Sequence, residues 1–247
     1  MQRSLEGHVA LITGSVRRIG RATALALARD GAALVVHARS SLEEAERTAA
    51  EIKDAGGRAL VHLAEVTSEA AVKSMFDAVL SQFGRIDVLV NNAAVRADTA
   101  FTEMSFAEWR SVTGIMLDGA FLCSRAALPH MAARRYGRII NVGGISAHLG
   151  VGGRAHVITG KAGLVGLTRA LAAEFAAAGI TVNCVVPGRI GGPRSATSGK
   201  GISGGQAPVG REGIPEDVAE VIRMLCQPST SYVTGQTIHV NGGMFMP

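Results

Sequence analysis

The sequence predicts a single α/β domain in which helices cover both faces of a doubly wound, parallel sheet. Its 247 residues are enough for one large domain of this class with a sizeable core. Short apolar runs alternate along the chain with amphipathic helical patterns, which is typical of repeated βα units. No internal repeat or linker interrupts this alternation, so we expect one domain over residues 1–247.

Seven short apolar runs are the expected strands of the sheet. They are His8–Ile12, Ala33–His37, Ala59–Leu63, Val88–Asn91, Arg138–Val142, Thr181–Val186 and Thr237–Val240. Helical patterns fill the intervals between them, and two of these helices begin with a Ser-x-x-Glu capping box, at Ser41 and at Ser105. A stretch rich in Gly, Ser and Pro at about residues 191–209 fits neither pattern. Because a loop this long is unusual in a compact domain, we expect a flexible substrate lid there.

The composition excludes several classes of protein. Hydrophobic residues make up 47% of the chain and charged residues 18%, which indicates a globular protein with a buried core. No apolar run reaches the roughly 18 residues that a membrane helix needs, and the first residues lack the apolar core of a signal peptide. The three cysteines are widely spaced and odd in number, which favours neither a disulfide framework nor a zinc site. We therefore expect a cytoplasmic protein with no membrane partner and no bound metal.

A formal net charge of +5 raises the question of nucleic acid as a partner. The basic residues are mostly scattered arginines, and aromatic residues make up only 4% of the chain, which leaves little for base stacking. This pattern is typical of a solvated basic surface with one anion pocket. We expect a small-molecule ligand and no nucleic acid.

The anion pocket is predicted where the first strand ends. Residues 13–21 read Thr-Gly-Ser-Val-Arg-Arg-Ile-Gly-Arg and lead into a helix from about Arg21 to Arg29. A glycine turn between a strand and a helix directs backbone N–H groups and the positive end of the helix dipole at a phosphate. This context predicts the dinucleotide-binding loop of a Rossmann fold. The expected contacts come from Gly14, Ser15, Arg17, Arg18, Ile19 and Gly20.

The end of the second strand predicts which dinucleotide binds. In a Rossmann unit this position lies at the adenosine 2′ site, where an acidic residue suits the hydroxyl of NAD and an arginine suits the phosphate of NADP. Here the sequence has Arg39 followed by Ser40, and Arg17 of the first loop is expected within reach. Two guanidinium groups and no carboxylate favour NADP(H) over NAD(H).

With these motifs in hand, nearly the whole chain resembles the short-chain dehydrogenase/reductase family. The loop resembles the family's TGxxxGxG, with Arg18 in place of the middle glycine, and the Arg17–Arg18 pair is similar to the 3-oxoacyl-ACP reductase-like and pteridine reductase-like branches. Four further segments resemble family motifs: Asn91-Asn92-Ala93-Ala94 resembles NNAG, Glu65-Val66 stands where the family usually has Asp-Val, residues 187–190 resemble PGxI, and residues 234–243, which end in Asn-Gly-Gly, resemble TGQ…DGG. The resemblance implies further cofactor contacts from Glu65, Val66, Asn91, Ala93, Pro187, Gly188 and Ile190.

The same resemblance implies a catalytic set of Asn, Ser, Tyr and Lys. In the family, tyrosine protonates the carbonyl oxygen, serine holds it, lysine lowers the tyrosine pKa and binds ribose, and asparagine holds a relay water. Lys161 matches the lysine, but Val157, Gly144 and Met116 stand at the positions of tyrosine, serine and asparagine. None of these three side chains can act as a general acid.

Several nearby residues are candidate substitutes for the missing acid. His148, Ser146 and Arg154 lie on the loop that leads to the Lys161 helix and could reach the cleft. His156 is next to the tyrosine position, but on a helix it points about 100° away from it. His148, His156 and Arg154 are therefore candidate proton donors, and for each the alternative is a purely local structural role.

Three functions remain open. The first is an NADP(H)-dependent oxidoreductase with an atypical active site that acts on a carbonyl or alcohol. The second is a regulatory protein or pseudoenzyme that binds NADP(H) without hydride transfer. The third is a lyase, isomerase or cyclase that uses the same pocket. The resemblance also implies a homo-oligomer, a tetramer or a dimer, built from residues 106–134, 157–178 and 235–247.

Overall fold

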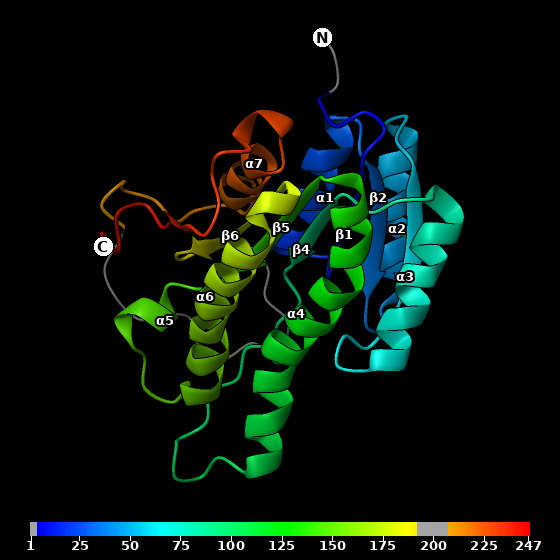
Figure 1. Ribbon diagram of the computed structural model, residues 1–247. Helices are drawn as coiled ribbons and strands as arrows, with labels where there is room; N and C mark the ends of the chain where they lie inside the picture. The colour runs from blue at the N-terminus through cyan, green and yellow to red at the C-terminus, as the bar shows by residue number, and fades with distance from the viewer. Residues whose placement is uncertain (1–3, 192–206) are drawn as a thin grey trace.

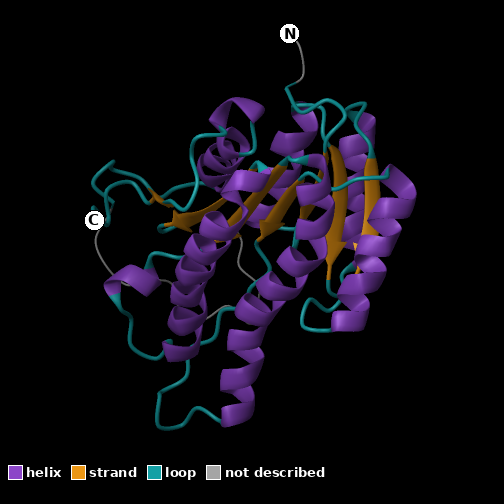
Figure 2. Cartoon of the chain, in the orientation of Figure 1, coloured by secondary structure: helices purple, strands orange, loops and turns teal. Residues whose placement is uncertain are grey.

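The computed structural model describes residues 4–191 and 207–247 and confirms the doubly wound α/β class. Seven strands form one sheet in the order β3-β2-β1-β4-β5-β6-β7, and every neighbouring pair is parallel (Figures 1 and 2). The chain runs outward from β1 to β3 and then returns to place β4 beside β1. That reversal creates the switch point at which ligands of such sheets bind. The strands are β1 (Val9–Ile12), β2 (Ala33–Ala38), β3 (Ala59–Leu63), β4 (Val88–Asn91), β5 (Gly137–Val142), β6 (Ile180–Pro187) and β7 (Thr237–Val240).

Three long helices cover each face of the sheet. One layer contains α1 (Arg18–Arg29), α2 (Leu42–Asp54) and α7 (Pro215–Leu225), and the other contains α3 (Glu69–Phe83), α4 (Phe106–Arg134) and α6 (Ala155–Phe175). A short helix, α5 (Ser146–Leu149), follows β5. Successive strand residues point to opposite faces, so Ile12 packs with the α1 layer and Leu11 with the α3 layer. Central strands buried on both sides read as unbroken apolar runs, which is why the sequence revealed them.

The observed elements depart from the expected ones at a few ends. Helix α1 begins at Arg18, three residues before the expected Arg21, so the second arginine of the loop belongs to the first helical turn. The Ser105 hydroxyl caps α4 by accepting from the Glu108 amide, as predicted. The Ser41 hydroxyl makes no such contact with the α2 backbone. Most of the expected lid at 191–209 lies outside the described residues.

Helix α4 accounts for the only apolar stretch of membrane-spanning length in the described part of the chain. Of its most apolar window, 56% is buried inside the fold. The helix packs against α3, α6 and the sheet, with Cys123, Ala127 and Met131 in the core. Its composition is therefore explained by packing between these neighbours.

Candidate functional site

The loop between β1 and α1 is held in a shape that only glycine permits at two points. Gly14 has a φ of +68°, in the left-handed region. A Cβ on Gly20 would lie 2.2 Å from the Gly14 carbonyl oxygen and 2.7 Å from Asn92 Nδ2. The Asn92 amide also donates to the carbonyls of Thr13 and Gly14, each at 2.9 Å. The start of α1 is thus locked against the loop, with its amide end facing the switch point.

His37, at the end of β2, is a second support of this loop that sequence reasoning missed. The Gly14 amide donates to His37 Nδ1 at 3.0 Å, and Nε2 lies 3.0 Å from the Ala64 carbonyl oxygen. Because Nδ1 accepts, the ring is neutral with its proton on Nε2. Burial is the main cause that lowers its pKa, which favours the same neutral form. A histidine two residues before Arg39 was the available signal, but its partners come from other strands.

A cleft of about 1090 Å³ opens at the carboxyl ends of the central strands. Its walls come from the glycine loop, from the segments after β4, β5 and β6, and from α2, α6 and the start of α7. It brings together eight of the sequence-predicted cofactor residues, namely Arg17, Arg18, Ile19, Gly20, Lys161, Pro187, Gly188 and Ile190. The other eight lie outside its lining, namely Gly14, Ser15, Arg39, Ser40, Glu65, Val66, Asn91 and Ala93. The cleft therefore joins the predicted phosphate loop to the predicted catalytic lysine.

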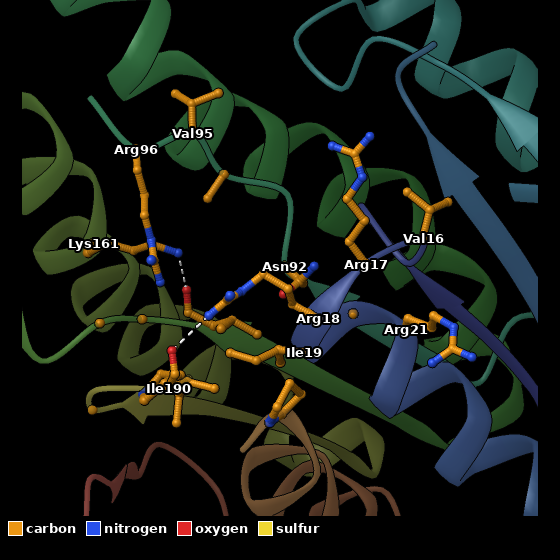
Figure 3. A pocket seen from close by; sticks show the side chains of 18 of the residues that line it. Val16, Arg17, Arg18, Ile19, Arg21, Asn92, Val95, Arg96, Lys161 and Ile190 are labelled. Atoms are coloured by element: carbon orange, nitrogen blue, oxygen red, sulfur yellow. Dashed lines mark hydrogen bonds between the residues drawn. The ribbon is translucent and has the colours of Figure 1, made fainter. Parts of the chain in front are cut away.

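Arg18 crosses this cleft near the glycine loop. Its φ is +49°, a conformation that side chains other than glycine adopt at a cost of about 1–2 kcal/mol. Its guanidinium donates to the Ile190 carbonyl oxygen at 2.8 Å (Figure 3). One cation thus connects the loop after β1 with the segment after β6.

The two arginines expected at the 2′-phosphate each lie beside a carboxylate. Arg17 forms an ion pair with Glu44 of α2 at 2.7 Å. Arg39 lies 4.0 Å from Glu65 and is mostly exposed. The hydrogen bond to Arg17 is the largest cause that lowers the pKa of Glu44. Glu44 is therefore an anion at neutral pH that a bound phosphate would meet.

Lys161 of α6 lies at the other end of the cleft and is buried. Its ammonium donates to the carbonyl oxygen of Val142, and among the described residues no carboxylate pairs with it. Burial lowers its pKa to about 8, the Cys184 thiol opposes that shift, and Arg96 adds to it. Figure 3 shows the Arg96 side chain, from the loop after β4, extending toward Lys161. The sequence did not single out Arg96, because its neighbour lies 65 residues away in sequence (161 minus 96).

A buried amide network fixes α6, and with it Lys161, against the sheet. Asn91 donates to Asn141 at 2.9 Å and to Ser124 at 3.2 Å. Asn141 in turn donates to Thr168 of α6 at 2.9 Å. These bonds tie β4 and β5 to α4 and α6 in a setting without water competition, where they specify one arrangement. Asn91 is thus a structural support beneath the cleft.

The comparisons with known proteins agree with this geometry. A family model described as Enoyl-(Acyl carrier protein) reductase matches residues 14–245. The chain is 40% identical over 244 residues to the 3-oxoacyl-[acyl-carrier-protein] reductase of Synechocystis, which covers 98% of this chain and 99% of the relative. It is 40% identical over 240 residues to the FabG reductase of Staphylococcus aureus, with 96% and 98% covered, and 37% identical over 246 residues to that of Escherichia coli, with 98% and 99% covered.

The chain belongs to the short-chain dehydrogenase/reductase family. The resemblance found in the sequence is thereby confirmed. The segments that carried it, the glycine loop and the PGxI segment, face each other across the cleft. The chain is thus a member of an oxidoreductase family, and its cleft joins the glycine loop to Lys161.

Three positions that the resemblance assigns to the short-chain dehydrogenase/reductase tetrad lie around Lys161. Val157 and Gly144 line the cleft, and Met116 is buried against Val157 and Gly160. A Cβ on Gly144 would meet only Lys161 Cγ at 3.7 Å and Ser146 Oγ at 3.9 Å, so a side chain fits there. The side chains at these three positions offer the cleft neither a hydroxyl nor an amide group.

The three candidate proton donors predicted from the sequence lie in different surroundings. Arg154 lines the cleft and forms a two-pronged ion pair with Asp98. His156 is fully buried, 3.4 Å from Glu108, and does not line the cleft. The His148 ring packs against His239 and Phe245, with centroids 4.6 and 5.4 Å away, and also lies outside the lining. Of the three, the structure brings only Arg154 to the cleft.

Proposed function

We propose that this protein is an NADP(H)-dependent oxidoreductase that acts on a small carbonyl or alcohol substrate, with NADP(H) preferred over NAD(H). The observation that carries the proposal is a single cleft with the glycine loop at one end and a buried lysine at the other. A cleft of about 1090 Å³ has room for a dinucleotide beside a small substrate. The atypical part of the proposal is Val157 and Gly144 in the wall beside Lys161.

The residues present suit the cofactor chemically. The amide end of α1 and the loop from Gly14 to Gly20 would hold the pyrophosphate, because backbone N–H groups and the helix dipole favour an anion there. Arg17 and Arg39 would hold the 2′-phosphate as charge-assisted donors. Lys161 would hold the ribose hydroxyls, and the segment 187–190 would border the nicotinamide. When bound, the reduced cofactor supplies a hydride to the carbonyl carbon.

The relatives suggest the first substrate to examine. Three of them are named 3-oxoacyl-[acyl-carrier-protein] reductases, so a 3-oxoacyl thioester belongs in the test panel. In enzymes that have them, proton donation contributes about 10²- to 10⁴-fold and a hydrogen-bond donor to the oxygen about 10²- to 10³-fold. Because Val157 and Gly144 supply neither, we expect slow reduction of generic ketones with cofactor binding intact.

The direct test is a titration with NADPH and NADH, followed by a panel of carbonyl compounds. NADPH should quench or shift intrinsic and nucleotide fluorescence at lower concentration than NADH. Turnover is then measured as loss of NADPH absorbance with a 3-oxoacyl thioester, a small ketone and an aldehyde. Failure to bind NADPH would contradict the cofactor assignment, and binding without any turnover would contradict the oxidoreductase assignment.

A second function is favoured by the same two residues. If Val157 and Gly144 have removed proton transfer altogether, the protein binds NADP(H) as a regulatory or pseudoenzyme subunit. This alternative predicts tight NADPH binding, no reduction of any carbonyl and a change of activity in a relative that it contacts. With either function, we propose that the protein is cytoplasmic and forms a homo-oligomer.

A further inference from the structure

Lys161 presents an ammonium group directly to the substrate end of the cleft. The side chain at the preceding helical turn is Val157, and Gly144 lies beside the Lys161 stem, so neither of these two positions places a hydroxyl next to the amine. Its one bond among the described residues goes to the Val142 carbonyl oxygen. An ammonium has three donors, which leaves donors available for a ligand. Lys161 can therefore meet a substrate oxygen itself.

Arg96 supplies a second cation at the same place. Its guanidinium acts on Lys161 through its charge, and both residues line the cleft (Figure 3). The loop that carries Arg96 follows Asn92, which is anchored to Thr13 and Gly14. A planar guanidinium is a strong, permanently charged donor to an oxygen that becomes negative. Two cations that line the same end of a cleft suit an oxyanion.

Lys161 and Arg96 are the main charged groups at this end of the cleft among the residues that the structure describes. From β6 it faces the Cys184 thiol, whose pKa burial raises to about 11, so the thiol is neutral at physiological pH. From α5 and the start of α6, the cleft receives Ser146 and the Asp98-bound Arg154. The carboxylates in the lining, Glu44, Glu51 and Glu216, come from α2 and α7. None of them pairs with Lys161.

We propose that Lys161 and Arg96 together bind and protonate the carbonyl oxygen of the substrate, in place of a tyrosine and a serine. This inference rests on the proposed oxidoreductase function and names the residues that complete it. As the carbonyl carbon gains the hydride, the π electrons of the C=O bond move to oxygen. That oxygen takes a proton from Nζ of Lys161 while the guanidinium of Arg96 holds its charge. The substrate becomes an alcohol, and the neutral amine regains a proton from water.

Titration of Lys161 gives a test that does not depend on turnover. The chain has only four lysines, so trace acetylation at a series of pH values, read by mass spectrometry, reports each one separately. Lys161 should titrate near pH 8 in the folded protein. Because Arg96 disfavours the charged amine, Arg96→Gln should move that titration to higher pH. Arg29→Gln, which removes an equal charge from the exposed end of α1, should leave it unchanged.

Kinetics on the same proteins test the chemical roles. With NADPH and the best carbonyl of the panel, kcat should fall above pH 8, because only the protonated amine is a donor. Lys161→Arg keeps the charge but cannot release a proton, so kcat should fall about 10²-fold or more. Arg96→Gln should lower kcat/KM about 10²- to 10³-fold, move the falling limb to higher pH and change the Kd of NADPH little. Circular dichroism checks that each variant is folded.

The outcomes separate this inference from the proposed function. Ketone reduction that survives both Lys161→Arg and Arg96→Gln would overturn the inference and leave the oxidoreductase assignment standing. A loss of activity in Arg96→Gln without a shift of the Lys161 titration would overturn the pairing of the two residues. Binding of NADPH with no reduction of any carbonyl by the unmodified protein would overturn both.

Discussion

Arg17 and Arg39, the two guanidinium groups on which the NADP(H) preference rests, each lie beside a carboxylate. A 2′-phosphate would share Arg17 with Glu44, which is 2.7 Å from it. We therefore expect the proposed cofactor preference to depend on the balance between the Arg17 cation and the Glu44 anion of α2, and substitutions can shift that balance in either direction.

We predict that Arg39→Ala lowers the ratio of NADPH to NADH affinity about tenfold or more, since a charge-assisted contact contributes about 1.5–3 kcal/mol. Glu44→Gln should act in the opposite direction and tighten NADPH several-fold, because it removes an anion beside the phosphate. Both nucleotides are titrated by fluorescence or calorimetry. Arg29→Ala serves as a control for net charge. An unchanged ratio in Arg39→Ala would contradict the 2′-phosphate assignment.

The wall beside Lys161 can be tested by restoring what the family uses there. Gly144→Ser has room, because its Cβ would meet atoms no closer than 3.7 Å. Val157→Tyr must fit among Val112, Met116 and Val95. If it does, the double variant should raise ketone turnover by about 10²-fold or more with little change in NADPH affinity. Gly144→Ala is the matched control and should not raise turnover. Equal turnover by the double variant and by Gly144→Ala would show that the substrate's carbonyl oxygen gains nothing from the added hydroxyl groups.

Among the elements, the ends of β2 and β3 support the glycine loop through His37. The neutral ring accepts from Gly14, and a second proton on Nδ1 would remove that acceptor. Burial lowers the pKa of His37 below its ordinary value of 6.5, so the unfolded chain takes up the proton more readily than the folded one. The associated stability is complete above about pH 6.5 and is lost as the pH falls.

We accordingly expect both the free energy of unfolding and the NADPH affinity to decrease from pH 7.5 to pH 5. His37→Gln should be less stable at pH 7.5 and should show a shallower decrease. The unmodified protein is compared with His37→Gln because His62, His148 and His239 also have lowered pKa values and change the free energy of unfolding with pH in the same direction. Urea unfolding at several pH values measures how the free energy of unfolding of each protein depends on pH. Identical slopes in the two proteins would show that His37 does not titrate with folding.

The contact between α1 and the glycine loop is a second element-scale feature. Gly20→Ala would place a methyl group 2.2 Å from a backbone oxygen, which cannot be relieved by turning a side chain. We expect a loss of about 1–3 kcal/mol of unfolding free energy and much weaker NADPH binding. Gly152→Ala, where nothing lies within 4 Å, should change stability by less than about 0.5 kcal/mol. Tight NADPH binding by Gly20→Ala would mean that the glycine loop accommodates the methyl group with no loss of binding free energy.

At the scale of the whole molecule, the outer faces of α4 and α6 are suited to self-association. On α4, Phe106 and Phe121 are 75% and 49% exposed. On α6, the exposed residues include a stripe of small side chains, Ala162, Gly166, Ala170 and Ala173, beside the exposed Arg169 and Glu174. Ala172 belongs to the segment 157–178 that was expected at the interface, but it packs inward near Gly235, because the helical period turns it toward the core. Small residues on an outer face let a partner helix approach closely.

We predict a dimer or tetramer at micromolar concentration, measured by light scattering. Phe121→Arg, on the exposed face of α4, should shift the mass toward the monomer while leaving the circular dichroism spectrum unchanged. Arg110→Glu is a control for a charge change on the same helix. A monomeric mass for the unmodified protein would contradict the assembly.

The sequence by itself determined the architecture and the presence of the predicted loop and lysine. Buried strands read as apolar runs, the glycine loop follows β1 directly, and Lys161 stands in a recognisable helix, so all of these signals are local. A local pattern can be recognised in the sequence even when the residues that pack against it are unknown. The same local reading fell short at helix ends, where Glu44 forms an ion pair with Arg17 instead of completing the Ser41 box.

Only the tertiary structure decided which residues meet in the cleft. Arg18 contacts Ile190 across 172 residues of sequence, and His37 contacts Gly14 across 23. Arg96 reaches Lys161 because β4 and α6 are brought together by the sheet order and the buried asparagine network. Such contacts depend on how helices and strands pack at the switch point, and no periodicity or motif in one segment encodes the distance to another. The architecture could thus be predicted from local patterns, whereas the chemistry of the cleft required the fold.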